Sequence, residues 1–382
     1  MKVNKWTAAL ASAGVLSGVT AVQAEESPVM TALSSTSISG YVDVSAHWNP
    51  GDNNDGGEGF SSRPSYGKNE NNKTDGFNLN VVNLQLTKPL DESQWAAGYH
   101  VDLLFGPDAA AYNTSVGTAA DDSDFGVKQA YVNLRAPVGN GLDFKLGVFD
   151  TVIGYEVFHN GGNPNYTRSY GWGVEPTQHT GVLASYAFND ILSASAGIAN
   201  THNAGINNRA HPPQAEDNKT WMGSVAFTAP ESLGFMEGST LYAGVVHGFN
   251  TSGGVTQDNY YVGATFATPV EGLGVGVAYD YVDMTAVDGY QNVFGLYASF
   301  QVTEKMSIHG RGEYAEGNLI FSGNSSGTGK VWAATGTLQY DLWDNVLTRL
   351  EVRWDQAKGG QATTGWSRNN ELLVAFNAIY QF

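Results

Sequence analysis

The sequence predicts an all-β protein, a transmembrane antiparallel β-barrel of about sixteen strands with long outer loops and short periplasmic turns. In the last segment, 371–382, one face carries only Leu372, Val374, Phe376, Ala378, Tyr380 and Phe382. Twelve residues at about 3.3 Å each, tilted by about 40°, just cross a thin apolar layer. No segment after residue 24 offers about 18 consecutive apolar residues, so only a closed barrel could span a bilayer. The 47 glycines, 9 Trp, 19 Tyr and 17 Phe are typical of many short strands that face both lipid and water.

Residues 1–24 are expected to be a secretory signal peptide, because Lys2 and Lys5 precede a mostly apolar stretch that ends at Ala24. A membrane anchor is the alternative, but serines, glycines and a threonine interrupt the stretch, which is short for a spanning helix. Residues 25–37 then form a short lead and residues 38–382 the barrel. Export of such a barrel implies the outer membrane of a Gram-negative bacterium.

The expected mature chain is strongly acidic. Removal of the signal peptide takes away two lysines and no acids, which leaves 17 basic against 37 acidic residues and a formal charge of −20. This charge argues against nucleic acid as a partner. The chain has no cysteine, so disulfides and thiol chemistry are excluded.

Two-residue alternation of apolar and polar side chains begins at Ile38 and recurs to the end of the chain. The alternation slips at Val81 and Val82, which predicts a bulge. An even number of strands would place both chain ends on the periplasmic side. The predicted strands are 38–48, 77–88, 94–105, 126–136, 142–150, 180–188, 191–200, 220–228, 239–249, 258–268, 273–282, 290–302, 306–316, 330–341, 347–356 and 369–382.

One face of these strands is expected to contact lipid and the other to contact water. Aromatic residues near the strand ends suit the membrane interfaces, namely Trp95, Tyr260, Phe300, Trp332, Tyr340, Trp354, Tyr380 and Phe382. A lipid-facing Arg or Lys at the membrane midplane costs about 2–4 kcal/mol, so charged side chains are expected to point inward. Two roles are open for them, bracing of the wall by ion pairs and control of ion selectivity. The pore-lining candidates are Arg135, Lys145, Asp280, Arg311, Glu313, Arg349, Glu351 and Arg353.

The third outer loop, residues 151–179, is richer in aromatic residues than a solvated loop needs. This composition predicts that the loop folds into the barrel and constricts it. Glu156 and Glu175 would then face arginines of the wall and create a transverse electric field. An ordinary surface loop or an oligomer contact is the alternative. The constriction candidates are Tyr155, Glu156, Arg168, Tyr170, Trp172 and Glu175.

No catalytic residue, cofactor site or metal site can be assigned from the sequence. The histidines are scattered, and glycine pairs such as Gly161-Gly162 follow no strand-to-helix pattern of a phosphate-binding loop.

Four stretches of the first half resemble the OmpL-like beta-barrel porin family of Gram-negative outer membranes. They are SISGYVDVSAHW from Ser37, FNLNVVNLQLTKPL from Phe77, LGVFDTVIGYEVF from Leu146 and NYTRSYGWGVEPTQHTGV from Asn165. Beyond Asn200 the similarity lies in the strand rhythm and the terminal Phe382. The resemblance implies a channel in the outer membrane and does not identify its solute. The end of the last strand also resembles the signal that the barrel-assembly machinery reads.

The functional hypothesis from the sequence is a porin, a water-filled channel for passive diffusion of small hydrophilic solutes and ions. The acidic charge favours a weak preference for cations, whereas the inward arginines argue the other way. Its partners would be outer-membrane lipid and its solutes, with a homotrimer left open. The alternatives are a barrel with a structural or adhesive role and a barrel hydrolase, for which no nucleophile or acid cluster can be identified.

Overall fold

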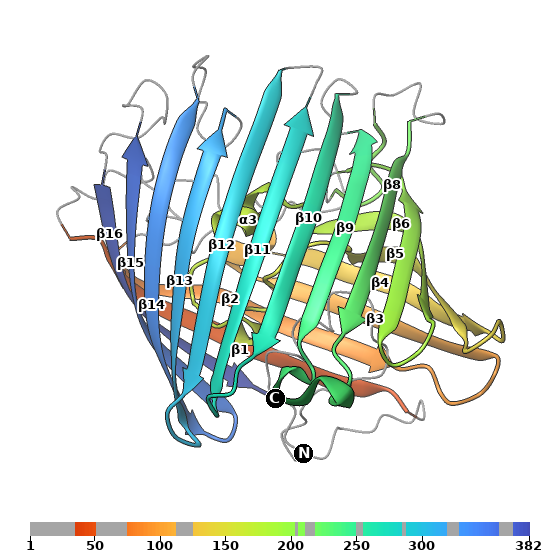
Figure 1. Cartoon of the computed structure of the whole chain (residues 1–382). Helices are drawn as coiled ribbons and strands as arrows, with labels where there is room; N and C mark the ends of the chain where they lie inside the picture. The colour runs from red at the N-terminus through yellow and green to blue at the C-terminus, as the bar shows by residue number, and fades with distance from the viewer. Residues whose placement is uncertain are drawn as a thin grey trace.

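Sixteen antiparallel strands form one closed barrel in the computed structural model (Figure 1). The structure describes residues 35–50, 75–111, 125–202, 205–210, 218–249, 255–284, 288–318, 328–358 and 370–382. Each strand pairs with its neighbours in sequence, and β1 pairs with β16 to close the ring. The predicted fold class is therefore confirmed. The expected signal peptide and most of the lead, residues 25–37, lie outside the described residues.

The strand boundaries agree with the sequence prediction to within two residues at each end. Alternation locates these strands well because each one has an inner and an outer face of different polarity. The strands are β1 Ser37–Trp48, β2 Gly76–Lys88, β3 Ala96–Phe105, β4 Phe125–Ala136, β5 Leu142–Asp150, β6 Gln178–Ala187, β7 Leu192–Ala199, β8 Thr220–Thr228, β9 Thr240–Phe249, β10 Thr256–Ala267, β11 Leu273–Met284, β12 Gly289–Gln301, β13 Met306–Gly317, β14 Gly329–Trp343, β15 Val346–Lys358 and β16 Asn370–Gln381.

Within the described residues, four short helical segments lie in connections between strands: α2 Pro107–Ala111, η2 Asn160–Gly162, α3 Tyr170–Val174 and η4 Glu231–Met236. Among the described helices, none has the length and apolar character needed to cross a membrane. Both η2 and α3 belong to the connection between β5 and β6, which contains the candidate site.

The two faces of the wall differ as predicted. In β16, Phe376 and Tyr380 are about half exposed on the outside, whereas Asn377 and Ile379 are fully buried on the inside. All eight aromatic residues expected near strand ends are exposed. The outer face is thus apolar and aromatic, and the inner face carries the polar groups.

Three register shifts occur in the described strands, and two of them are bulges that modify the inner face. Asp43 pairs with Val81 and Val44 with Leu79, so Asn80 is an extra residue in β2, one position before the predicted slip. A second bulge, which the sequence analysis missed, makes Lys128 the extra residue in β4. Bulges bend a strand and redirect its side chains. The Lys128 side chain is fully buried inside the barrel as a result.

Candidate functional site: the loop inside the barrel

The connection between β5 and β6, residues 151–177, lies inside the barrel. Figure 1 shows α3 behind β11 and β12, within the ring of strands. Val152, Phe158 and Tyr170 of this loop are buried against inward side chains of the strands. The predicted loop reached residue 179, but Gln178 and His179 already belong to β6.

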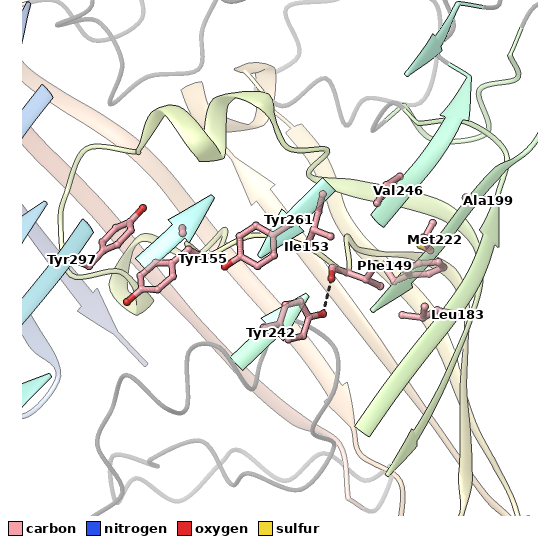
Figure 2. Close-up of a cluster of buried hydrophobic side chains, with 12 residues drawn as sticks. Phe149, Ile153, Tyr155, Leu183, Ala199, Met222, Tyr242, Val246, Tyr261 and Tyr297 are labelled. Atoms are coloured by element: carbon pink, nitrogen blue, oxygen red, sulfur yellow. Dashed lines mark hydrogen bonds between the residues drawn. The ribbon is translucent and has the colours of Figure 1, made fainter. Parts of the chain in front are cut away.

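The first part of the loop packs against the apolar side of the inner wall. Phe149, Val152, Ile153 and Tyr155 join inward side chains of β6 to β12 in one cluster (Figure 2). Tyr155 stacks on Tyr297 of β12 with ring centroids 3.9 Å apart. The Tyr242 hydroxyl donates a hydrogen bond of 2.5 Å to the carbonyl of Val152. This packing fixes where the loop enters the lumen.

Gly276 of β11 makes room for Tyr155. A Cβ atom at this position would overlap the Tyr155 hydroxyl oxygen. The stacked arrangement of Tyr155 and Tyr297 therefore depends on a glycine in the facing wall.

The middle of the loop is bound by Arg311 of β13. Its guanidinium donates to Glu156 Oε1 at 2.8 Å, to the carbonyl of Thr167 at 2.6 Å and to Glu313 Oε2 at 2.7 Å. The side chains of Arg311 and Glu156 are 0% and 1% exposed. Removal of one partner of a buried ion pair strongly destabilises the folded arrangement, because the other charge stays buried without compensation. Arg311 therefore anchors the loop to the wall.

Two further arginines, both on β15, bind loop carbonyls. Arg353 donates to the carbonyl of Arg168 at 2.6 Å and pairs with Asp355 of its own strand at 2.8 Å. Arg349 donates to the carbonyls of Asn160, at 3.1 Å, and Asn163. Their charges are directed at the backbone of the loop.

Wall carboxylates bind the N–H groups of the same loop segment. Glu351 accepts from the amides of Tyr166 at 2.6 Å and Thr167 at 2.9 Å, and Glu313 accepts from the amide of Tyr170 at 2.6 Å. Charge-assisted hydrogen bonds of this kind are about twice as strong as neutral ones. The inward charges thus hold the loop, a role that the two sequence-based readings, bracing and selectivity, did not include.

The loop also contacts β1 to β3, which follow β16 around the ring. His159 lies 2.9 Å from Asp102 of β3 and 3.0 Å from Gln85 of β2, and the Tyr41 hydroxyl is 3.1 Å from its Nδ1. The alternation of β3 places Asp102 on the inner face, so the sequence could have indicated this contact. The polar contacts thus follow an arc of the ring from β13 through β16 to β3, and the apolar cluster adds β6 to β12, so the loop is attached across the lumen.

The two loop glutamates differ in their partners. Glu156 contacts a wall arginine as predicted, but the expectation for Glu175 was wrong, because its carboxyl shares a hydrogen bond with Asp280 of β11. Asn259 donates to the carbonyl of Val174 at 2.7 Å, which holds the end of α3 against β10 and β11. A hydrogen bond between two carboxyl groups requires a proton on one of them. Burial, and then the Asp280 charge, raise the pKa of Glu175 well above its ordinary value.

The other predicted residues take smaller parts. The Arg168 guanidinium lies 4.9 Å from the Trp172 ring centroid, and the Tyr170 hydroxyl donates to Asp355 at 2.8 Å. Arg135 is away from the loop and forms a two-point ion pair with Asp143 on the wall, at 2.7 Å for each bond.

Lys145 is half-buried and lies over the Tyr131 ring, with 5.0 Å between Nζ and the ring centroid. Within the ranges that the structure describes, no group of three or more side chains is placed to hold a metal ion.

A family model described as putative beta-barrel porin-2, OmpL-like, matches residues 35–382. No curated protein matches the chain.

Several solved structures share the fold at low sequence identity. OmpT of Vibrio cholerae in a trimer form is 11% identical, with a TM-score of 0.57 over 91% of this chain and 99% of that one. The anion-selective porin of Comamonas acidovorans is 15% identical, with a TM-score of 0.57 over 91% and 99% of the two chains. Salmonella typhi OmpF, in complex with daunomycin, is 11% identical, with a TM-score of 0.60 over 91% and 97%. At such identities the likeness shows the fold alone.

Proposed function

The chain belongs to the putative beta-barrel porin-2, OmpL-like family, and on that premise we propose that it forms a channel for passive diffusion of small hydrophilic solutes and ions across the outer membrane of a Gram-negative bacterium. The observation that carries the proposal is a closed sixteen-strand wall, apolar outside and polar inside, with one loop bound across its interior. Barrels of about this size are wide enough to enclose an aqueous lumen. Loop 151–177 then acts as the constriction.

We propose a weak preference for cations. Acidic groups outnumber basic ones in the described interior: Asp43, Asp102, Asp143, Asp150, Glu156, Glu175, Asp280, Glu313, Glu351 and Asp355 face only Lys128, Arg135, Lys145, Arg168, Arg311, Arg349 and Arg353. The three arginines of β13 and β15 are almost fully buried and bind the loop. Many of the acids are as deeply buried, and Glu175 and Asp280 share a proton, so the proposal rests on the remaining excess of nine negative over seven positive charges.

Single-channel recording in planar bilayers tests the proposal. We expect stepwise, ohmic conductance and a reversal potential in a salt gradient that favours potassium over chloride. Gel mobility before and after boiling checks that the purified barrel is folded. A folded barrel that gives no conductance steps would reject the channel, and a chloride-selective reversal potential would reject the cation preference alone.

A barrel with a structural or adhesive role is the second candidate. It is favoured by one observation, the attachment of the loop to strands around most of the ring, because a loop bound in this way could close the lumen. Such a barrel would conduct no ions until the loop is removed. Recordings from a variant lacking residues 161–173 separate the two candidates.

We also propose three features of biogenesis and assembly. The signal peptide is cleaved after Ala24, which amino-terminal sequencing of the mature protein tests. The barrel-assembly machinery recognises the strand that ends at Phe382, so Phe382→Ser should lower the amount of assembled barrel. A homotrimer is supported by the trimer form of OmpT with the same fold, and the mass of the detergent-solubilised protein tests it.

A further inference from the structure

One basic side chain of the interior differs from all the others. The other six basic residues inside the described barrel each bind a carboxylate or a loop carbonyl: Lys128, Arg135, Arg168, Arg311, Arg349 and Arg353. Lys145 of β5 makes no ion pair and no hydrogen bond with any residue that the structure describes, and its contact is the Tyr131 ring. The residue as a whole is half-buried.

Two neighbouring polar side chains also have no hydrogen-bond partner among the residues that the structure describes. Asn133 pairs directly with Lys145 across β4 and β5, and Tyr131 lies two residues further along the same face. Directly paired residues of neighbouring strands have Cβ atoms about 4.5–5.5 Å apart. Among the described residues, neither the Tyr131 hydroxyl nor the Asn133 side-chain amide has a protein partner, and both residues are half-buried.

Two glycines face each other beside Tyr131. Gly147 follows Lys145 on the inner face of β5 and pairs with Gly181 of β6. Gly147 has φ of +137°, and a Cβ atom there would overlap the carbonyl oxygen of Ala130. Other residues are strained in this conformation. The backbone therefore leaves this one position of the wall without side chains, whereas Leu183 of β6 lies directly beside Lys145.

We propose that Lys145, Tyr131 and Asn133 form a subsite that binds the carboxylate group of a solute passing through the barrel. An ammonium, a phenol hydroxyl and an amide NH₂ are all hydrogen-bond donors, and together they match the oxygens of a carboxylate. The Tyr131 ring lies beneath the ammonium and orients it by a cation–π contact. This inference rests on the proposed channel function and narrows its solutes to a chemical class.

The charge around the subsite selects a singly charged group. The nearby acids already have partners, since Asp150 pairs with Lys128 and Asp102 contacts His159. The ammonium of Lys145 therefore supplies one unpaired positive charge, which one carboxylate balances and a doubly charged phosphate exceeds. Weak cation preference and this subsite are compatible, because the first concerns the whole interior and the second concerns one position of the wall.

The test compares channel conductance in potassium acetate and potassium chloride over a concentration series. In wild type we expect conductance to saturate in acetate and to rise further in chloride. Lys145→Gln should weaken acetate binding about tenfold, the factor that corresponds to about 1.4 kcal/mol for one charged hydrogen bond. Lys145→Arg should keep the saturation. Arg135→Gln removes the same unit of charge from a paired arginine and should behave as wild type.

Equal concentration dependence in the two salts, or the same loss in Arg135→Gln as in Lys145→Gln, would overturn the subsite. If conductance also saturates in potassium phosphate, and Lys145→Gln abolishes that saturation in the same way, the preference of the subsite for a carboxylate would be overturned. A second measurement does not depend on conduction. It detects binding of ¹³C-labelled acetate to the folded barrel in detergent by the broadening of the acetate NMR line. If no conductance steps occur in any salt, the channel function fails, and the loss of line broadening in Lys145→Gln still decides whether the subsite exists.

Discussion

Replacement of Arg311 by methionine should release the loop from the wall. The change removes a cation that is 2% exposed and leaves the carboxylates of Glu156 and Glu313 without it. Breaking a buried ion pair costs about 3–5 kcal/mol. The lower end applies here, because Glu156 still accepts from the amide of Ser169 at 3.0 Å and Glu313 from that of Tyr170 at 2.6 Å. A cost of about 3 kcal/mol shifts the equilibrium between docked and released loop about 150-fold.

The barrel itself should survive this change, since its strands are joined by backbone hydrogen bonds, in which the Arg311 side chain takes no part. In single-channel recordings we expect a level of higher conductance, produced by the released loop, whose occupancy rises by about this factor. The double variant Arg311→Met with Glu156→Gln should recover part of the loss, because it removes one of the stranded charges.

Arg135→Met is the matched control. It breaks an ion pair with Asp143 whose side chains are 27% and 12% exposed and which does not touch the loop. Partly exposed pairs contribute about 1 kcal/mol or less, so the conductance levels should not change. Unaltered levels and occupancies in Arg311→Met, in a barrel shown to be folded by its gel mobility, would refute the anchoring role of Arg311.

Three further predictions concern the same loop. Deletion of residues 161–173 should raise conductance severalfold if the loop makes the constriction, and normal conductance would show that it does not. Because the pKa of Glu175 is raised in the docked loop, the docked state keeps a proton that the released state loses, so docking should weaken as pH rises above about 4.5. Open-channel noise should therefore increase with pH in wild type and should not depend on pH in Glu175→Gln. If the noise of this variant still rises with pH, another titratable group is responsible. Gly276→Ala should displace Tyr155 from its stack on Tyr297 and lower the stability of the docked loop by about 1–3 kcal/mol. The near-ultraviolet circular dichroism spectrum should then change while the strand content stays the same. An unchanged spectrum would show that the wall accommodates the methyl group.

The sequence alone was sufficient for the wall of the barrel. Each strand has two environments, lipid and interior, and the two-residue period records both, so even the strand ends agree with the structure. The same two-residue period predicted that Arg311 and Arg353 point inward. The aromatic content of residues 151–179 predicted that the third loop folds into the barrel. These signals are local, because each depends only on residues close together in the chain.

Only the tertiary structure decided which inward charges meet. Arg311 and Glu156 are far apart in sequence, and their contact depends on how the loop crosses the lumen. For the same reason Glu175 could not be assigned to Asp280, because the direction in which α3 ends is set by Asn259 of a distant strand. The bulge that turns Lys128 inward has no clear signal in the alternation.

The composition and alternation of the chain thus determined a closed β-barrel with an apolar outside and a charged inside. The docking of the loop was decided by the folded structure, and so was the contrast, among the interior residues that the structure describes, between six bound basic side chains and the unpaired Lys145. The physical reason is that burial preferences act residue by residue along a strand. Charge pairing depends instead on distances between segments that only closure of the barrel brings together.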